Sequence, residues 1–340
     1  MVTRGIVLAS AWVTGAVDFR ALDILGNLAL LAALVVLGGS LDRARGLMTW
    51  ALLFPIVLQP QIGKLMFYPM AAIQAFVGLL FSVLYLRDAL SETRGYRSLA
   101  FYAIAVLTSG SGLILPLVGI PVLLRRGLRR AALVHGVIAV VAIAAYGPAS
   151  SGLPYLARHP WSVAQFFLLV LGAVAQIPGQ PWIQLVAGLT LLGYFVHVVR
   201  RGAGGAVPAF LFYLLLMVAL VAVGRTSIYE GELWRWSLDG RYRVYSSLFL
   251  AICGVDVVHR LDARARRWVA PVVLGAALAF NLVWYAHAAG EFRRASVERV
   301  AAMTRWRAGG DVTQLPLLAS PPQYAAANLT TAIENGVYRP

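Results

Sequence analysis

The chain has 340 residues, of which 60% are hydrophobic and only 13% are charged, and its mean hydropathy is strongly positive. A soluble globular protein carries about 25% charged residues, so this composition excludes a soluble globule. The net charge of +15 would indicate nucleic-acid binding in a soluble protein, but in a membrane protein basic residues set the topology from short loops. We therefore expect a polytopic protein whose partner is the lipid bilayer, with no nucleic acid bound.

Apolar runs alternate with short polar loops along most of the chain. Several runs approach the ~20 residues that a helix needs to cross a bilayer. We predict an all-α membrane helix bundle of roughly ten to twelve segments, short or re-entrant ones included, over residues 1–287, followed by a polar C-terminal tail over 288–340. In chain order the predicted segments are 5–17, 24–41, 47–58, 65–86, 99–123, 131–146, 161–176, 182–199, 207–223, 245–258 and 269–287.

The segment 99–123 is long enough for one crossing, but Ser109-Gly110-Ser111-Gly112 interrupts it in the middle. Serine and glycine are poor residues for a helix interior. We therefore predict two short helices that meet at this turn and form a hairpin.

Basic residues occupy five short loops, and together they predict the topology. The loops are 42–45, 87–97, 125–130, 200–201 and 260–267. The positive-inside rule places all five in the cytoplasm. This arrangement requires that the 109–112 turn faces outward and that segment 161–176 dips into the outer leaflet without crossing. The 224–246 loop and the C-terminal tail then lie outside the cytoplasm.

The 224–246 loop is the most densely charged interval between apolar segments, and it is the first candidate site. Guanidinium groups match phosphate oxygens bidentately, and carboxylates suit a general base or a divalent metal. The alternative is an exposed loop whose charges pair with one another and whose aromatic residues form an interfacial belt. The candidate phosphate-binding residues are Arg225, Arg241, Tyr242 and Arg243, and the candidate catalytic carboxylates are Glu230, Glu232 and Asp239.

Two further polar turns are candidate binding elements on the same predicted face. Ser109 and Ser111 belong to a turn whose backbone amides could cradle an anion at the mouth of a helix, and the alternative is a plain tight turn. Gln61 and Lys64 lie at the outer end of a pair of spans, where snorkelling and interhelical hydrogen bonds are the alternative explanation.

Other kinds of site are disfavoured by the sequence. The five histidines are dispersed without ligand spacing, and the single cysteine, Cys253, allows no disulfide framework. No Walker-type phosphate loop and no Gly-x-Ser-x-Gly nucleophile motif occurs. We therefore expect no histidine-based metal site, no cytoplasmic ATPase and no serine hydrolase.

The order of these features resembles a broad group of bacterial multi-pass membrane proteins, which is similar in layout to the GT-C membrane glycosyltransferases. Four short stretches carry the resemblance: Val17-Asp18-Phe19-Arg20-Ala21-Leu22 with Gly26-Asn27-Leu28; Ser109-Gly110-Ser111-Gly112-Leu113-Ile114-Leu115-Pro116-Leu117; Gly224-Arg225 with Gly240-Arg241-Tyr242-Arg243-Val244-Tyr245-Ser246; and Gly336-Val337-Tyr338-Arg339-Pro340. The resemblance implies a location in the bacterial cytoplasmic membrane. It also implies a polyprenyl-phosphate sugar as donor and an envelope glycan or lipid as acceptor.

In one respect the chain departs from the GT-C pattern. Those enzymes carry an acidic motif in the first outer loop, and no pair of acidic residues precedes Gly5. Asp18 and Asp23 are the nearest acidic residues. The open alternatives are a chain that is truncated relative to such enzymes, a lost activity, or a likeness of layout alone. The rival class is a non-catalytic membrane subunit or a lipid or solute carrier.

Overall fold

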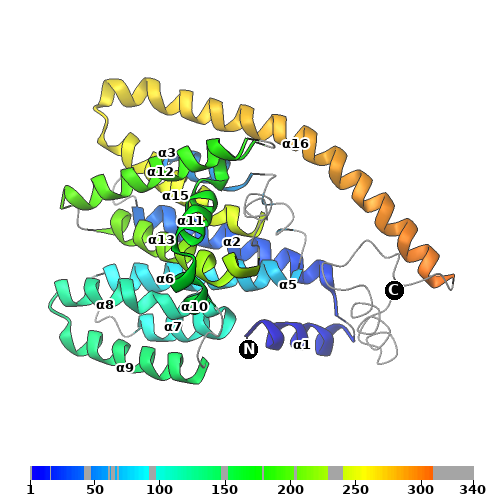
Figure 1. Ribbon diagram of the computed structural model, residues 1–340, viewed down its shortest axis with the longest axis horizontal. Helices are drawn as coiled ribbons and strands as arrows, with labels where there is room; N and C mark the ends of the chain where they lie inside the picture. Colours follow the sequence, from blue (N-terminus) through cyan, green and yellow to red (C-terminus); the bar gives the residue numbers. More distant parts are fainter. Residues whose placement is uncertain are drawn as a thin grey trace.

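The computed structural model describes residues 2–15, 17–41, 47–59, 62, 66, 69–91, 97–146, 152–177, 180–202, 205–228 and 240–308. Throughout these ranges the regular elements are helices, and no strand occurs among them (Figure 1). The elements are α1 (Val2–Thr14), α2 (Phe19–Leu41), α3 (Leu47–Val57), α5 (Pro69–Ala72), η2 (Ile73–Val77), α6 (Gly78–Leu90), α7 (Arg97–Thr108), η3 (Gly110–Ile114), α8 (Leu115–Arg125), α9 (Arg129–Tyr146), α10 (Gly152–Arg158), α11 (Pro160–Leu171), η4 (Ala173–Ala175), α12 (Pro181–Arg200), α13 (Ala206–Arg225), η5 (Thr226–Ile228), α15 (Gly240–Arg260) and α16 (Ala263–Arg307). The predicted all-α helix bundle is confirmed.

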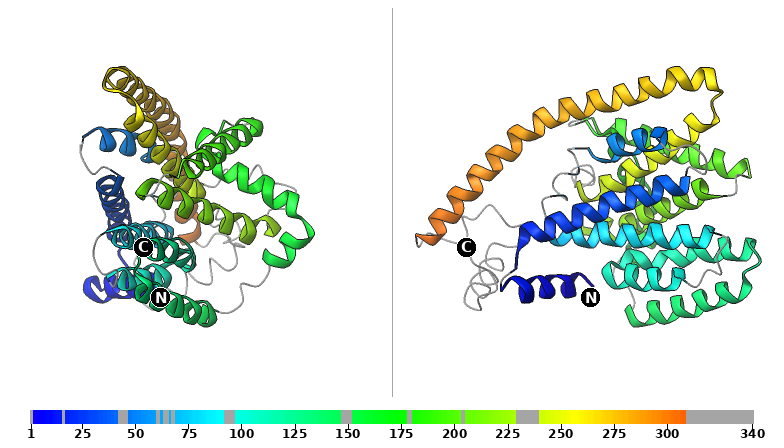
Figure 2. Two further views of the ribbon diagram at one scale, coloured as in Figure 1. Left: turned by 90° about the vertical axis from the view of Figure 1, so that its left-hand side faces the viewer. Right: turned by 180° about the vertical axis from the view of Figure 1, so that it is seen from behind.

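Five of the described helical stretches are long and apolar enough to cross a membrane, and they make this a multi-pass membrane protein. They are Phe19–Leu41, Met70–Leu90, Pro181–Arg200, Ala206–Ile228 and Arg264–Ala286. Most of the long helices run along the same direction, side by side (Figures 1 and 2). The helix α11 is an exception, because it lies crosswise to them in both figures. With 12 residues it is about 18 Å long, too short to cross a hydrocarbon core of about 30 Å.

The predicted hairpin at 109–112 is also present. The helix α7 ends at Thr108, the 3₁₀ turn η3 follows, and α8 runs back in the opposite direction, packed on α6 and α9 (Figure 1). Gly112 packs so tightly against the backbone of Val106 that a side-chain carbon at this position would overlap it. The glycine therefore has a packing role as well as its effect on helix propensity.

Glycines bring other helices into close contact, as is common where bundles pack in lipid. A side-chain carbon at Gly26 of α2 would lie 2.9 Å from the Cβ atom of Ala72. Between α11 and α12 the approach is closer still. A side chain at Gly172 would overlap the carbonyl oxygen of Gln184, and one at Gly188 would overlap that of Leu168. These glycines allow the crosswise helix α11 to enter the bundle.

Four of the five basic loops of the sequence join helix ends that lie at one end of the bundle, which we call the basic end (left in Figure 1). The last residues of α6, α8, α12 and α15 and the first residues of α7, α9, α13 and α16 all lie there. The remaining basic loop of the sequence analysis, 42–45, lies outside the described residues. We call the other end the distal end. It holds η3, the end of α13 and the beginning of α15.

The last helix differs from the prediction in its length. The predicted final span, 269–287, overlaps the candidate membrane span Arg264–Ala286, and α16 continues beyond it without a break to Arg307. Its 45 residues correspond to about 68 Å, roughly twice the thickness of the hydrocarbon core. The helix begins at the basic end and extends past the distal end (Figure 2). Residues 309–340 lie outside the described part of the chain.

Candidate functional site

The helices α13 and α15 are antiparallel neighbours, and their ends form the described part of the predicted 224–246 site (Figure 1). Arg225 is the last residue of α13, and its side chain is exposed. The predicted catalytic carboxylates Glu230, Glu232 and Asp239 lie outside the described residues, as do Gln61 and Lys64. The roles of these five residues stay predictions.

The other predicted residues of this loop lie in the first turn of α15. Arg241, Tyr242 and Arg243 are helical. Tyr242 is buried in the apolar core, and Arg243 is half-buried with its Nε atom shielded from solvent. The side chain of Arg241 lies outside the described part. Arg243 thus lies at the distal end of the bundle, between the buried core and the surface.

A hydrogen-bonded clamp fixes the beginning of α15. The Ser246 hydroxyl donates to the Leu171 carbonyl oxygen, and its oxygen accepts the Val174 backbone N–H at 3.0 Å. Gly172 lies between the end of α11 and the beginning of η4. Because the helix is interrupted there, the Leu171 carbonyl and the Val174 N–H need a partner from outside these two helices. Ser246 satisfies both groups. Arg243 lies three residues earlier in α15, on the same side of the helix as Ser246.

Two polar atoms near the clamp have no hydrogen-bond partner among the described residues. They are Gln176 Oε1, which follows η4, and Ser247 Oγ, which follows Ser246. A buried polar atom that stays unpaired costs about 1–3 kcal/mol. The clamp region therefore combines a half-buried cation with buried polar groups that a polar ligand or water could satisfy.

The 109–112 turn gives less support to an anion site. The Ser109 N–H donates to the Ala105 carbonyl oxygen at 2.9 Å, and the Gly112 N–H donates to the Ser109 carbonyl oxygen at 2.9 Å. Two of the amides proposed as a cradle are thus used within the turn, which fits the tight-turn alternative. The side chain of Ser111 lies outside the described part, and the role of Ser109 and Ser111 in binding stays a prediction.

A polar cluster that the sequence analysis missed lies between α6, α7 and α9. His135 is buried; its Nε2 atom is 2.9 Å from Ser98 Oγ, and its Nδ1 atom is 2.7 Å from the Ala131 carbonyl oxygen. A carbonyl only accepts, so a neutral His135 carries its proton on Nδ1 and accepts the Ser98 hydroxyl at Nε2. The Ser98 backbone N–H also donates to Asp88 Oδ2 at 2.9 Å.

The Ser98–His135 pair resembles part of an activated serine, but Asp88 contacts the Ser98 backbone N–H and not His135. Ser98 and His135 are both completely buried, and the Tyr85 ring packs 5.7 Å from the His135 ring. The buried Ser98–His135 hydrogen bond therefore joins α7 to α9 inside the bundle. A search for histidine pairs could not find it. The signal was the spacing of Ala131, His135 and Ala139, which places one histidine on a face of small buried residues.

At the basic end, a second polar network holds α12 against α15. Asp256 Oδ2 accepts the Tyr194 hydroxyl at 2.7 Å and the Arg260 Nε–H at 2.7 Å. Arg266 then donates to the carbonyl oxygens of Val258 and His259 at the end of α15 and to that of Leu261 just after it. A cation at the C-terminal end of a helix is stabilised by the helix dipole. This network fixes the turn between α15 and α16.

The described residues contain no group of three His, Cys, Asp or Glu side chains that could hold a metal ion. A divalent metal at the predicted site would need Glu230, Glu232 and Asp239, which lie outside those residues. Comparison of the chain with family models, with curated proteins and with solved structures finds no match.

Proposed function

We propose that this multi-pass protein is a bacterial cytoplasmic-membrane protein of GT-C-like architecture. It binds a polyprenyl-phosphate-linked sugar at the distal end and transfers the sugar to an envelope glycan or lipid. The basic end faces the cytoplasm, in accordance with the positive-inside rule. The observation that supports the proposal is the position of Arg225 and Arg243 at the same end of two neighbouring antiparallel helices.

In this proposal the arginines bind the phosphate and a carboxylate acts as the general base. Arg225 and Arg243, with Arg241, bind the phosphate oxygens through guanidinium forks. One of Glu230, Glu232 and Asp239 takes the proton from the acceptor hydroxyl. The acceptor oxygen then forms a bond to the sugar carbon while the bond from that carbon to the phosphate oxygen breaks. The arginines stabilise the charge of the departing polyprenyl phosphate.

Binding of polyprenyl phosphate to the purified protein in nanodiscs tests the proposal. Arg225→Ala and Arg243→Ala should each weaken binding about tenfold, which is the effect of losing one charge-assisted hydrogen bond. Arg200→Ala removes an exposed arginine at the basic end and is the control. Unphosphorylated polyprenol should bind weakly to every variant. Equal binding of polyprenyl phosphate to all variants would contradict the proposal.

A second candidate function is that of a non-catalytic membrane subunit, and the exposure of α16 favours it. This helix packs on α3 and leaves most of its membrane-crossing part uncovered. Trp268, Leu282 and Val283 are about 70% exposed on it. Cross-linking from these positions in native membranes distinguishes the two functions, because a subunit gives one defined product and an isolated enzyme gives none.

A further inference from the structure

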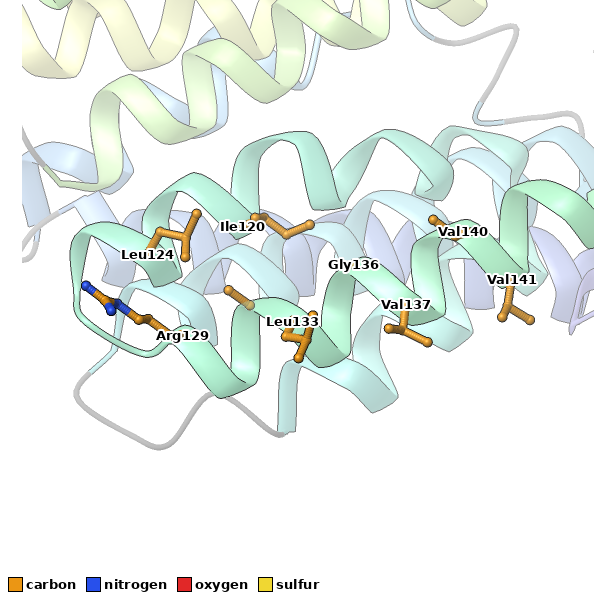
Figure 3. Close-up of a pocket in the computed structure, with 9 residues that line it drawn as sticks. Ile120, Leu124, Arg129, Leu133, Gly136, Val137, Val140 and Val141 are labelled. Carbon is orange, nitrogen blue, oxygen red and sulfur yellow. The ribbon is translucent and has the colours of Figure 1, made fainter.

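A shallow groove between α8 and α9 lies at the edge of the bundle (Figure 3). Its volume is about 670 Å³. Apolar side chains line it almost entirely, and one charged side chain, Arg129, lies at the end nearest the α8–α9 turn (Figure 3). The lining residues are Ile120, Leu124, Arg129, Ala132, Leu133, Gly136, Val137, Val140 and Val141.

The groove is open to the outside of the bundle along its length. Leu133 is 70% exposed and Val140 is 68% exposed, so the surroundings of α9 must supply apolar contacts. Gly136 forms the floor, because a side-chain carbon at this position would meet only Ile120 Cδ1, at 3.9 Å. The missing side chain of Gly136 leaves this part of the surface concave.

The charged end of the groove is free to bind an anion. Arg126 already forms a hydrogen bond within the protein, because its Nη1 atom donates to the Ala89 carbonyl oxygen at 2.7 Å. Arg125, Arg129 and Arg130 are exposed, and none of them forms an ion pair with another described residue. A hydrogen-bonded turn presents them: Gly127 has a positive φ of 75°, and Leu128 N–H donates to the Leu123 carbonyl oxygen.

The length of the groove matches one leaflet of a bilayer. From Arg129 to Val141 the helix rises about 18 Å. Half of a hydrocarbon core of about 30 Å is about 15 Å, so a groove that begins at the head-group level would reach near the middle of the membrane. An extended acyl chain that starts at the head-group level of that leaflet has this length and direction.

We propose that the groove binds one acyl chain of an anionic glycerophospholipid, with the lipid phosphate on Arg129. The apolar lining excludes a free phosphate as the main ligand, because it offers no polar group beyond the arginine. The charge at one end selects an anionic lipid over a zwitterionic one. This site lies at the opposite end of the bundle from the proposed sugar-donor site and does not depend on it.

Native mass spectrometry of the full chain, released from nanodiscs with equal parts phosphatidylglycerol and phosphatidylcholine, tests the inference. We expect the unmodified protein to retain phosphatidylglycerol preferentially. Arg129→Ala should lower that preference about tenfold, and Arg129→Lys should keep most of it. Gly136→Leu fills the groove without a clash at its first side-chain atom and should lower retention of the lipid.

Arg200→Ala is the matched control, because it removes an exposed arginine from the same end but outside the groove. It should leave the preference unchanged, and all variants should keep the unmodified unfolding temperature. If Arg129→Ala and Arg200→Ala behave alike, the arginine does not select the lipid and the proposal is wrong. If Gly136→Leu retains phosphatidylglycerol fully, the chain does not lie in the groove, and the proposal is equally wrong.

Discussion

Asn281 of α16 donates a hydrogen bond from Nδ2 to the carbonyl oxygen of Pro55 at 2.6 Å, although the two residues are 226 positions apart in the chain. The Pro55 carbonyl lies in the last turn of α3, where Gln59 N–H instead bonds the carbonyl oxygen of Val57. Carbonyls in a last helical turn need partners from elsewhere. Asn281 supplies one and fixes α16, which is otherwise mostly exposed, against the bundle.

Asn281→Leu should loosen α16 from the bundle. The substitution removes a bond that is largely buried and leaves the Pro55 carbonyl unpaired, which costs about 1–3 kcal/mol. Tyr285→Phe is the control, because its hydroxyl donates a longer bond of 3.3 Å to Leu58 from an exposed position. The rate of backbone amide hydrogen exchange in α16 should rise clearly for Asn281→Leu and little for Tyr285→Phe. Similar exchange in both variants would show that Asn281 does not hold the helix.

The clamp at the beginning of α15 gives a prediction with an adjacent control. Ser246→Ala leaves both the Leu171 carbonyl and the Val174 N–H unpaired, so the unfolding temperature should fall by several degrees. Ser247→Ala removes a buried hydroxyl that has no hydrogen-bond partner among the described residues and should be neutral or stabilising. Thermal unfolding in detergent measures both. Equal losses would show that the clamp is not specific to Ser246.

The contact between α11 and α12 predicts opposite effects for two glycines. Gly172→Ala should prevent normal packing, because the added carbon overlaps the Gln184 carbonyl oxygen. Gly193→Ala on α12 has open space around it and should be neutral or stabilising by up to about 1 kcal/mol. The yield of monodisperse protein on size-exclusion chromatography distinguishes them. A normal yield for Gly172→Ala would contradict the close approach of the two helices.

The proposed orientation can be measured with cysteines in a Cys253→Ser background. Ile228→Cys at the distal end is exposed and should react with a membrane-impermeant thiol reagent added to intact cells. Arg201→Cys at the basic end is also exposed and should react only after the membrane is opened. The reverse pattern would invert the topology and place the arginines of the proposed donor site in the cytoplasm.

Much of the bundle could be predicted, because its local signals are strong. The break at Ser109-Gly110-Ser111-Gly112 predicted the hairpin of α7 and α8, since residues that disfavour a helix interior act within one turn of the chain. The length of α16 was not predicted. After residue 287 its sequence becomes polar, but polar residues also form helices once the chain has left the membrane.

The candidate site was predictable only in outline. The charge density of the 224–246 interval identified its residues, but not the burial of Tyr242 or the half-burial of Arg243 in the first turn of α15. His135 was missed because its partner Ser98 lies 37 positions away, in a different helix. A search for spacing within one helix cannot find such a pair.

The sequence by itself determined where most of the apolar helices lie and which of the loops between them are basic. In lipid a run of about 20 apolar residues must satisfy its own backbone hydrogen bonds, and only local sequence is needed for that. The tertiary structure alone decided which polar groups meet: Asn281 with Pro55, Ser246 with the break after Leu171, and Ser98 with His135. Such pairs depend on how the helices pack, and the close glycine contacts that set this packing are properties of two helices together.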